Sequence, residues 1–156
     1  MDSISVLLFE HSVIRNLSRN PIEHWYTRFS DFNDFVINCH ARHEDEIVFP
    51  RLIDAYEDED FRKTVRRVSA DHKLIATLGS NILNWLSRGD HELLRMRIPL
   101  YFKVLLEHNS SEEQLLFKRW KPEMGSSFRR IILEFGVSKY MEITGASKEM
   151  IESYYE

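Results

Sequence analysis

The chain has 156 residues, of which 43% are hydrophobic and 12% aromatic, so a single domain with a substantial buried core is expected. Its formal net charge of −4 gives no electrostatic reason to bind nucleic acid or an anionic membrane surface. No stretch approaches the ~20 consecutive apolar residues that cross a bilayer, and the apolar run near Met1 lacks a basic leader and is too short for a signal peptide. The one cysteine, Cys39, cannot form an internal disulfide, as is usual in the reducing cytoplasm, where we expect this protein to reside.

Apolar residues recur at steps of three and four along most of the chain, which is the period of amphipathic helices. Four such stripes follow one another. In chain order their members are Ile4, Leu7, His11 and Ile14; Trp25, Phe29, Phe32, Val36, His40, Glu44 and Ile47; Phe61, Val65, Val68, His72, Ile75, Gly79, Ile82 and Leu86; and Leu94, Ile98, Tyr101, Leu105, His108, Glu112 and Leu115. This pattern predicts an all-α protein built on an antiparallel up-down four-helix bundle.

The breaks between the stripes agree with this arrangement at two of three turns. Residues at the same height on antiparallel neighbours should be equally far from the turn between them. The sequence midpoint between His40 and His72 is Tyr56, at the break that contains the acidic run of residues 57–60. The midpoint between His72 and His108 is Asp90, beside Gly89. The midpoint between His11 and His40 is near Trp25, about five residues after the stop signal Asn20-Pro21, so the first hairpin stays open. The fourth helix is expected to end at Lys121-Pro122.

The C-terminal part of the chain lies outside the four-helix pattern. We expect one helix over Phe128–Met141 and a short last helix capped by Ser147, with an apolar face that runs on to Tyr155. We therefore predict a four-helix bundle over residues 1–122 and an extension over 123–156. The extension is expected to pack either on its own bundle or at a dimer interface, so that the protein is a monomer or a homodimer.

Each of the four stripes carries one histidine, and the second and fourth add a glutamate one turn later. Residues at i and i+4 project from one helix face, so one helix can present an imidazole and a carboxylate together. The segments that start at His40 and His108 also share an acid at +5, two aliphatic residues and a phenylalanine at +9. The candidate ligands are His11, His40, Glu44, His72, His108 and Glu112.

These six polar groups in a bundle core require an interior partner, because unpaired buried carboxylates and imidazoles are costly. A metal is the obvious partner. Imidazole and carboxylate ligands without a thiolate suit iron or manganese, with zinc as a third candidate.

The motifs His40-x-x-x-Glu44-x-x-x-x-Phe49-Pro50 and His108-x-x-x-Glu112 resemble the two paired motifs of the hemerythrin-like (HHE cation-binding) family. His11 and the pair Asp71-His72 are similar to the histidine positions of that family's first and third helices. The resemblance covers about residues 4 to 120. It implies two non-haem, carboxylate-bridged iron ions, with the ligands distributed as His11 and His40 on one iron, His72 and His108 on the other, and Glu44 and Glu112 bridging.

One departure from that family concerns function. Oxygen-carrying hemerythrins have a second histidine four residues after that of the third helix, where this chain has Ala76. This weakens the case for reversible oxygen carriage. It leaves the binding of dioxygen, nitric oxide or iron for sensing, storage or stress response, and we expect a binding protein rather than an enzyme.

Two other readings stay open. A di-iron oxidase or peroxidase-like enzyme of the ferritin-like kind would use Glu-x-x-His pairs, and none of the seven histidines has an acid three residues before it. An oxidase that uses hemerythrin-like ligands remains an alternative. The third reading is a metal-free helical interaction module, and the metal content of the purified protein distinguishes it from the other two.

Several polar residues beside the candidates are expected to lie outside the ligand set. A shift of the second helix by one position would turn Cys39 and His43 inward, but the spacing to Pro50 favours His40. Glu10, Asp45 and Glu113 are expected to be solvated.

Overall fold

The structure is a computed structural model that describes residues 1–125 and 128–154, and among these residues there is no β-strand. The helices are α1 (Ser3–Leu17), α2 (Ile22–Phe35), α3 (Ala41–His43), α4 (Phe49–Ala55), α5 (Glu59–Ser87), α6 (His91–Leu115), α7 (Arg129–Phe135), α8 (Val137–Thr144) and α9 (Lys148–Ser153). The predicted all-α fold is therefore confirmed. None of the helices in this part of the chain combines the length and the apolar character needed to span a lipid bilayer.

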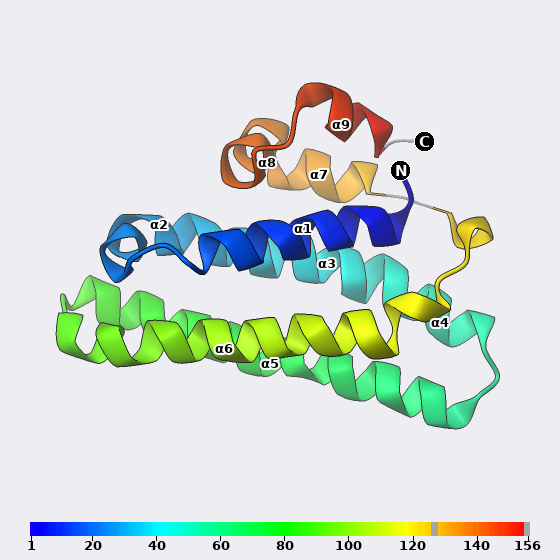
Figure 1. Ribbon diagram of the computed structural model, residues 1–156, viewed down its shortest axis with the longest axis horizontal. Coiled ribbons are helices and arrows are strands. Elements are labelled where there is room, and N and C mark those ends of the chain that lie inside the picture. Colours follow the sequence, from blue (N-terminus) through cyan, green and yellow to red (C-terminus); the bar gives the residue numbers. More distant parts are fainter. Residues whose placement is uncertain (126–127, 155–156) are drawn as a thin grey trace.

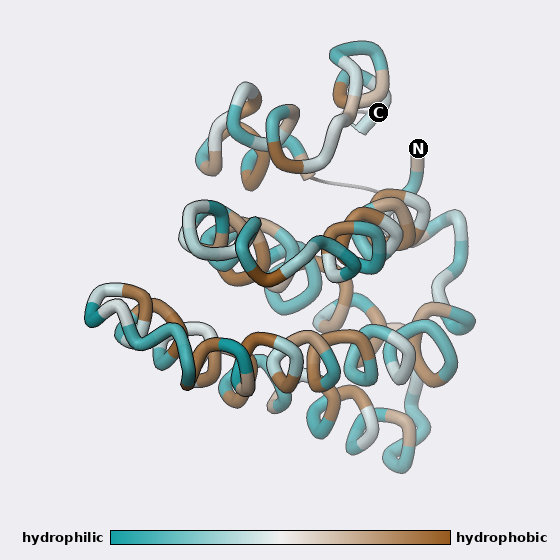
Figure 2. The backbone as a smooth tube through the Cα atoms, turned by 60° about the vertical axis from the view of Figure 1, so that its left-hand side comes forward, coloured by the Kyte–Doolittle hydropathy of each residue, from teal (hydrophilic) through white to brown (hydrophobic). Residues whose placement is uncertain are grey.

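The helices form three layers (Figure 1). The long helices α5 and α6 lie side by side in one layer, and α1 lies against them together with the helix that contains α2, α3 and α4. Helices α7, α8 and α9 cover the far side of α1, and Figure 2 shows the same order of layers from another direction. The first two layers are the antiparallel four-helix bundle.

The second bundle helix runs through residues 22–55 and widens twice into a π-helix, over Val36–His40 and Glu44–Val48. A π-turn closes i→i+5 hydrogen bonds and so contains more residues than an α-turn, and such insertions often occur at functional sites. Here they border the candidate ligands His40 and Glu44. The regular period assumed from the sequence is therefore broken where the polar residues lie.

The turns between the later helices follow the predicted signals. Gly89 has a φ of +68°, which glycine adopts without strain, and Asp90 caps α6 by accepting the N–H of Leu93 at 3.2 Å. Asp58 caps α5 in the same way by accepting the N–H of Phe61 at 3.2 Å. Local capping chemistry thus fixes the start of each of the two long helices.

The first hairpin turns at the stop signal and not at the midpoint. Helix α1 ends at Leu17 and α2 begins directly after Pro21, so the turn that the sequence left open lies at Asn20-Pro21 and not at the midpoint near Trp25. The midpoint argument assumes that every residue advances equally, whereas an extended residue advances about 3.3 Å and a helical one about 1.5 Å. At the opposite end of the bundle, α6 ends at Leu115, earlier than the predicted end at Lys121-Pro122, and a separate 3₁₀ turn over Phe117–Arg119 follows it.

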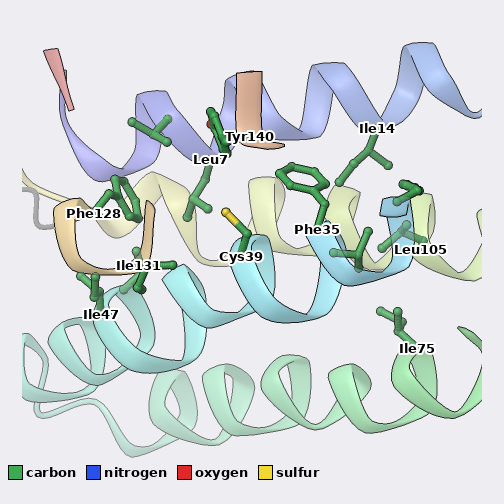
Figure 3. Close-up of a cluster of buried hydrophobic side chains, with 14 of the residues drawn as sticks. Leu7, Ile14, Phe35, Cys39, Ile47, Ile75, Leu105, Phe128, Ile131 and Tyr140 are labelled. Carbon is green, nitrogen blue, oxygen red and sulfur yellow. The ribbon is translucent and has the colours of Figure 1, made fainter. Parts of the chain in front are cut away.

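The predicted stripes form the core. Figure 2 shows hydrophobic and hydrophilic stretches alternating along the helices, and Figure 3 shows part of the buried cluster. The buried apolar members of the stripes are Leu7, Ile14, Trp25, Phe29, Phe32, Val36, Ile47, Phe61, Val65, Val68, Ile75, Ile82, Leu94, Ile98, Tyr101 and Leu105.

The C-terminal extension contains three short helices where the sequence predicts two. The helix expected over Phe128–Met141 divides at Gly136, whose φ of +111° is incompatible with a continuing helix. Ser147 caps α9 as predicted, with its hydroxyl oxygen accepting the N–H of Met150 at 3.1 Å. Tyr155, the last residue of the predicted apolar face, lies outside the described residues.

The extension covers one side of the bundle. Phe128, Ile131 and Tyr140 are each 0% exposed and point toward α1 and the second helix (Figure 3). At the rim, Arg42 donates a hydrogen bond from Nη2 to Oε2 of Glu134 at 2.8 Å. The apolar face of the extension is thus buried within the same chain.

Candidate metal centre

The fold brings all six candidate ligands together inside the bundle. His11 comes from α1, His72 from α5, His108 and Glu112 from α6, and His40 and Glu44 from the π-helical segments of the second helix. Five of the six are at most 5% exposed, and the side chain of His72 is 11% exposed. The centre is therefore nearly closed to water, with His72 as its most accessible member.

Each histidine directs Nε2 toward the two glutamates. The shortest Nε2–oxygen distances are 3.2 Å from His11 to Glu112, 3.7 Å from His40 to Glu44, 3.1 Å from His72 to Glu44 and 3.2 Å from His108 to Glu112. The ligand atoms fall into two groups, each with all members within 4.8 Å of one another: His11, His40, Glu44 and Glu112; and His72, His108, Glu44 and Glu112. We call the first pair of histidines the first half of the centre and the second pair the second half. Both glutamates belong to both groups, an arrangement suited to two adjacent cations.

The outer nitrogen of each ring faces another carboxylate. The Nδ1–oxygen distances are 3.3 Å from His11 to Glu113, 2.8 Å from His40 to Glu10, 2.8 Å from His72 to Asp45 and 3.1 Å from His108 to Asp71. A carboxylate at Nδ1 favours the tautomer with the proton there, which leaves the Nε2 lone pair free for a metal. Hydrogen bonds at Nδ1 thus orient His40, His72 and His108 for metal binding through Nε2, while Nδ1 of His11 lies near Glu113 without a hydrogen bond.

The inner atoms of the centre lack hydrogen-bond partners. Among the described residues, no hydrogen bond satisfies Nε2 of His11, His40 and His108 or any of the four oxygens of Glu44 and Glu112, and all seven atoms are buried. Several of these atoms approach one another closely, but without the directions that hydrogen bonds require. Buried polar atoms are normally paired, so the set fits a cation between the rings and the carboxylates.

Without a cation, protons compensate the charge of the two glutamates. Burial lowers the pKa of His72, but the carboxylates around it, Asp45 first, raise it to about 12. For His11, burial is likewise outweighed by carboxylates, Glu112 first, and the pKa rises to about 9. Burial and then the charge of Glu112 raise the pKa of Glu44 to about 7, whereas the surrounding imidazoles overcome burial and hold the pKa of Glu112 well below its usual range.

The expectation that Glu10 is solvated is wrong, because the extension covers it and its exposed fraction is 0%. His43 and Cys39 are also 0% exposed, although a regular helix would bury either them or the pair His40 and Glu44. The π-helical segments allow both sets to be buried, on two faces of one helix. His43 packs against Phe128 of the extension, with ring centroids 3.7 Å apart.

The outer carboxylates carry a sequence signal that was missed. Each is the neighbour in sequence of a candidate ligand, and each faces the histidine of the next helix. In order around the bundle, Glu10, beside His11, faces His40, and Asp45, beside Glu44, faces His72. Asp71, beside His72, faces His108, and Glu113, beside Glu112, faces His11. The pairs form a closed ring across the four bundle helices.

Comparison with known proteins agrees with this site. The sequence matches the family model described as the hemerythrin HHE cation binding domain over residues 2–120, which contains all six candidates. No match was found among curated proteins or among solved structures. Since the family match covers most of the chain, the protein belongs to the hemerythrin HHE cation binding domain family.

Proposed function

We propose that the protein binds two non-haem iron ions in its core. His11 and His40 are ligands of one ion, His72 and His108 of the other, and Glu44 and Glu112 bridge the two. The observation that supports this most strongly is the set of seven buried ring-nitrogen and carboxylate atoms for which no hydrogen-bond partner exists among the described residues.

The donor chemistry supports iron or manganese ahead of zinc. The six ligands supply imidazole and carboxylate groups without a thiolate, which suits iron or manganese, and zinc remains a third occupant. Cys39 faces Glu10 and His43 rather than the central carboxylates. Two carboxylates shared by two histidine pairs also favour a pair of ions over a single tetrahedral zinc, which takes four ligands.

The biological role in this proposal is the binding of a small ligand, either dioxygen or nitric oxide, or the holding of iron itself for sensing, storage or stress response. A bound pair of ferrous ions supplies electrons and open coordination positions to such a ligand. A surface depression is lined in part by Phe49, Ser69 and His72, so it reaches the most exposed of the candidate ligands. This role does not require a catalytic residue.

The proposal also keeps the division of the chain into a metal-binding bundle, residues 1–122, and an extension, residues 123–156. The burial of Phe128, Ile131 and Tyr140 against the bundle supports an extension that packs within its own chain. We place the protein in the cytoplasm, as a monomer or a homodimer.

Metal analysis of the purified protein tests the proposal. We expect about two irons per chain, and an absorption change when the reduced protein meets dioxygen or nitric oxide. A change that reverses on removal of the gas supports a binding protein, whereas consumption of the gas over many turnovers indicates an oxidase. Protein that takes up no metal, or a single tetrahedral zinc, would overturn the proposal.

A further inference from the structure

A line of buried hydrogen bonds connects the extension to one candidate ligand. Oε1 of Glu10 lies 2.8 Å from Nδ1 of His40, and the hydroxyl group of Tyr140 donates to Oε2 of Glu10 at 2.7 Å. The hydroxyl oxygen of Tyr140 lies 3.1 Å from that of Tyr154. All four side chains are at most 3% exposed. Three helices, α1, α8 and the second bundle helix, therefore meet at one carboxylate.

We infer that Tyr140 is a positioning residue for metal binding, which fixes Glu10 so that Glu10 orients His40, and that the extension thereby sets the metal affinity of the first half of the centre. The inference rests on the proposed function, because it concerns how tightly a cation is held. It assigns to the extension a role in the site that the bundle alone does not provide.

The need for Tyr140 follows from the burial of Glu10. The other outer carboxylates, Glu113, Asp45 and Asp71, are 31%, 41% and 47% exposed, so water can hydrogen-bond to their free oxygens. Glu10 is 0% exposed and depends on protein donors for both oxygens. Without the hydroxyl of Tyr140, its Oε2 would lose a short hydrogen bond in a dry environment, and the carboxylate would have to rotate or take up a proton.

Tyr140 is itself held in place. Its ring packs against Phe35 with centroids 6.0 Å apart, and Tyr154, directly after α9, approaches its hydroxyl group. Burial, together with the charge of Glu10, raises the pKa of Tyr140 far above its usual range, so the hydroxyl stays a neutral donor. Figure 3 shows the side chain entering the space beside α1 from the extension. A fixed donor of this kind defines one orientation of the carboxylate that it meets.

The same region contains a rival arrangement. Ligand atoms of Glu10, Cys39 and His43 lie within 4.8 Å of one another, and within the described residues neither ring nitrogen of His43 has a hydrogen-bond partner. A third metal ion could use this cluster. The hydrogen bonds favour positioning instead, because both oxygens of Glu10 already accept short bonds and burial raises the pKa of the Cys39 thiol far above its usual range.

The test is a stepwise titration of the metal-free full-length protein with Co²⁺, followed by absorption. In the wild type we expect two ions per chain. Tyr140→Phe keeps the ring and removes only the hydroxyl group; because Tyr140 acts on His40 through Glu10, it should weaken one binding step by about 10-fold, the lower end of the effect of losing a partner in contact with a ligating histidine. Asp71→Asn, which changes the carboxylate in contact with His108, should weaken the other step by roughly 10- to 100-fold and leave the first unchanged.

Each outcome decides the matter. Unchanged affinity in Tyr140→Phe, with only a lower melting temperature, would overturn the inference, since the hydroxyl would then be purely structural. If that variant does not fold, Tyr154→Phe replaces it and should weaken the same step by a smaller factor. Uptake of three ions, with the third lost in Tyr140→Phe, would favour the rival cluster. Two ions in the wild type with no variant effect contradicts only the inference, whereas no uptake by the wild type removes the proposed function as well.

Discussion

In the first half of the candidate centre, the carboxylate that faces His40 is connected to the C-terminal extension, whereas the carboxylates behind the second half lie near the surface. Glu10, which contacts His40, is 0% exposed, while Asp45 and Asp71 behind the second half are 41% and 47% exposed. Exposed pairs contribute about 0–1 kcal/mol because water screens them, and a buried carboxylate must be fully hydrogen-bonded to be tolerated. In both halves a carboxylate orients an imidazole ring. In the first half the pair of Glu10 and His40 is buried, so it also contributes to the stability of the fold.

The difference arises from the second bundle helix. Its two π-helical segments, Val36–His40 and Glu44–Val48, allow it to bury residues on two faces. One face meets the bundle core, and the other, with Cys39 and His43, meets the extension. A helix of regular period in a bare four-helix bundle would need only the first face. The second face is therefore buried by the extension and not by the bundle.

The largest expected effect tests whether the two halves are one site. Glu44 belongs to both groups of ligand atoms, so Glu44→Gln should reduce bound iron from about two per chain to nearly none. Metal analysis after reconstitution measures this. Glu46→Gln, two residues away on a side chain that is 40% exposed, should keep both ions. A Glu44→Gln protein that retains one tightly bound ion would mean that the halves are independent.

A second prediction concerns pH and the stability of the metal-free protein. The pKa values of His11 and His72 are raised from 6.5 to about 9 and about 12, and that of Glu44 from 4.5 to about 7. All three groups bind protons more tightly when folded, so their contribution to stability is complete below the unfolded pKa and is lost as pH rises toward the folded one. The lowered pKa of Glu112 acts only at acidic pH, where stability is lost below about 4.5.

Between pH 6 and pH 8 the metal-free protein should therefore lose stability, while metal binding strengthens because the ligands release protons more easily. The gap in melting temperature between loaded and metal-free protein should widen over this range by about 5 °C. Calorimetry of both forms at the two pH values measures it. Asp45→Asn should flatten the dependence, because Asp45 is the carboxylate that does most to raise the pKa of His72. A gap that narrows toward pH 8 would contradict the assignment of these protons.

Much of the bundle follows from the sequence because its signals are local. Helical period marks the buried stripes, and Gly89 and Asp90 mark a turn whose chemistry involves only neighbouring residues. The six candidate ligands also follow, since each takes the place of an apolar residue in a stripe. Their contact in the structure agrees with the equal heights inferred from the later turns. Their metal-binding role remains a prediction.

What the sequence did not yield depends on contacts between distant segments. No local signal marks the π-turns around His40 and Glu44, so the burial of His43 could not be inferred from a regular period. Glu10 is buried beside Tyr140, which lies 130 positions later in the chain and donates a hydrogen bond to it. The ring of outer carboxylates, by contrast, could have been predicted from the sequence, because each of its members is the direct neighbour of a candidate ligand.

The smallest expected effect tests the comparison between the halves most directly, in the absence of metal. Glu10→Gln and Asp45→Asn each make the same chemical change to a carboxylate 2.8 Å from a histidine Nδ1. In urea unfolding of the metal-free protein, Glu10→Gln should lower the free energy of unfolding by roughly 1.5–3 kcal/mol, the range for buried charge-assisted hydrogen bonds. An amide in that place can accept from His40 or from Tyr140 but not from both, and water cannot replace the lost partner.

Asp45→Asn should lower the same free energy by less than about 1 kcal/mol, because Asp45 is 41% exposed and water can solvate the variant. Glu113→Gln, at 31% exposure, provides an intermediate case on the first half without contact to the extension in the described part of the chain. Equal losses for Glu10 and Asp45 would break the comparison, since burial under the extension would then add nothing. A graded series in the order of burial would instead tie the stability that each carboxylate contributes to its burial, since each variant removes one charge at a position with different access to water.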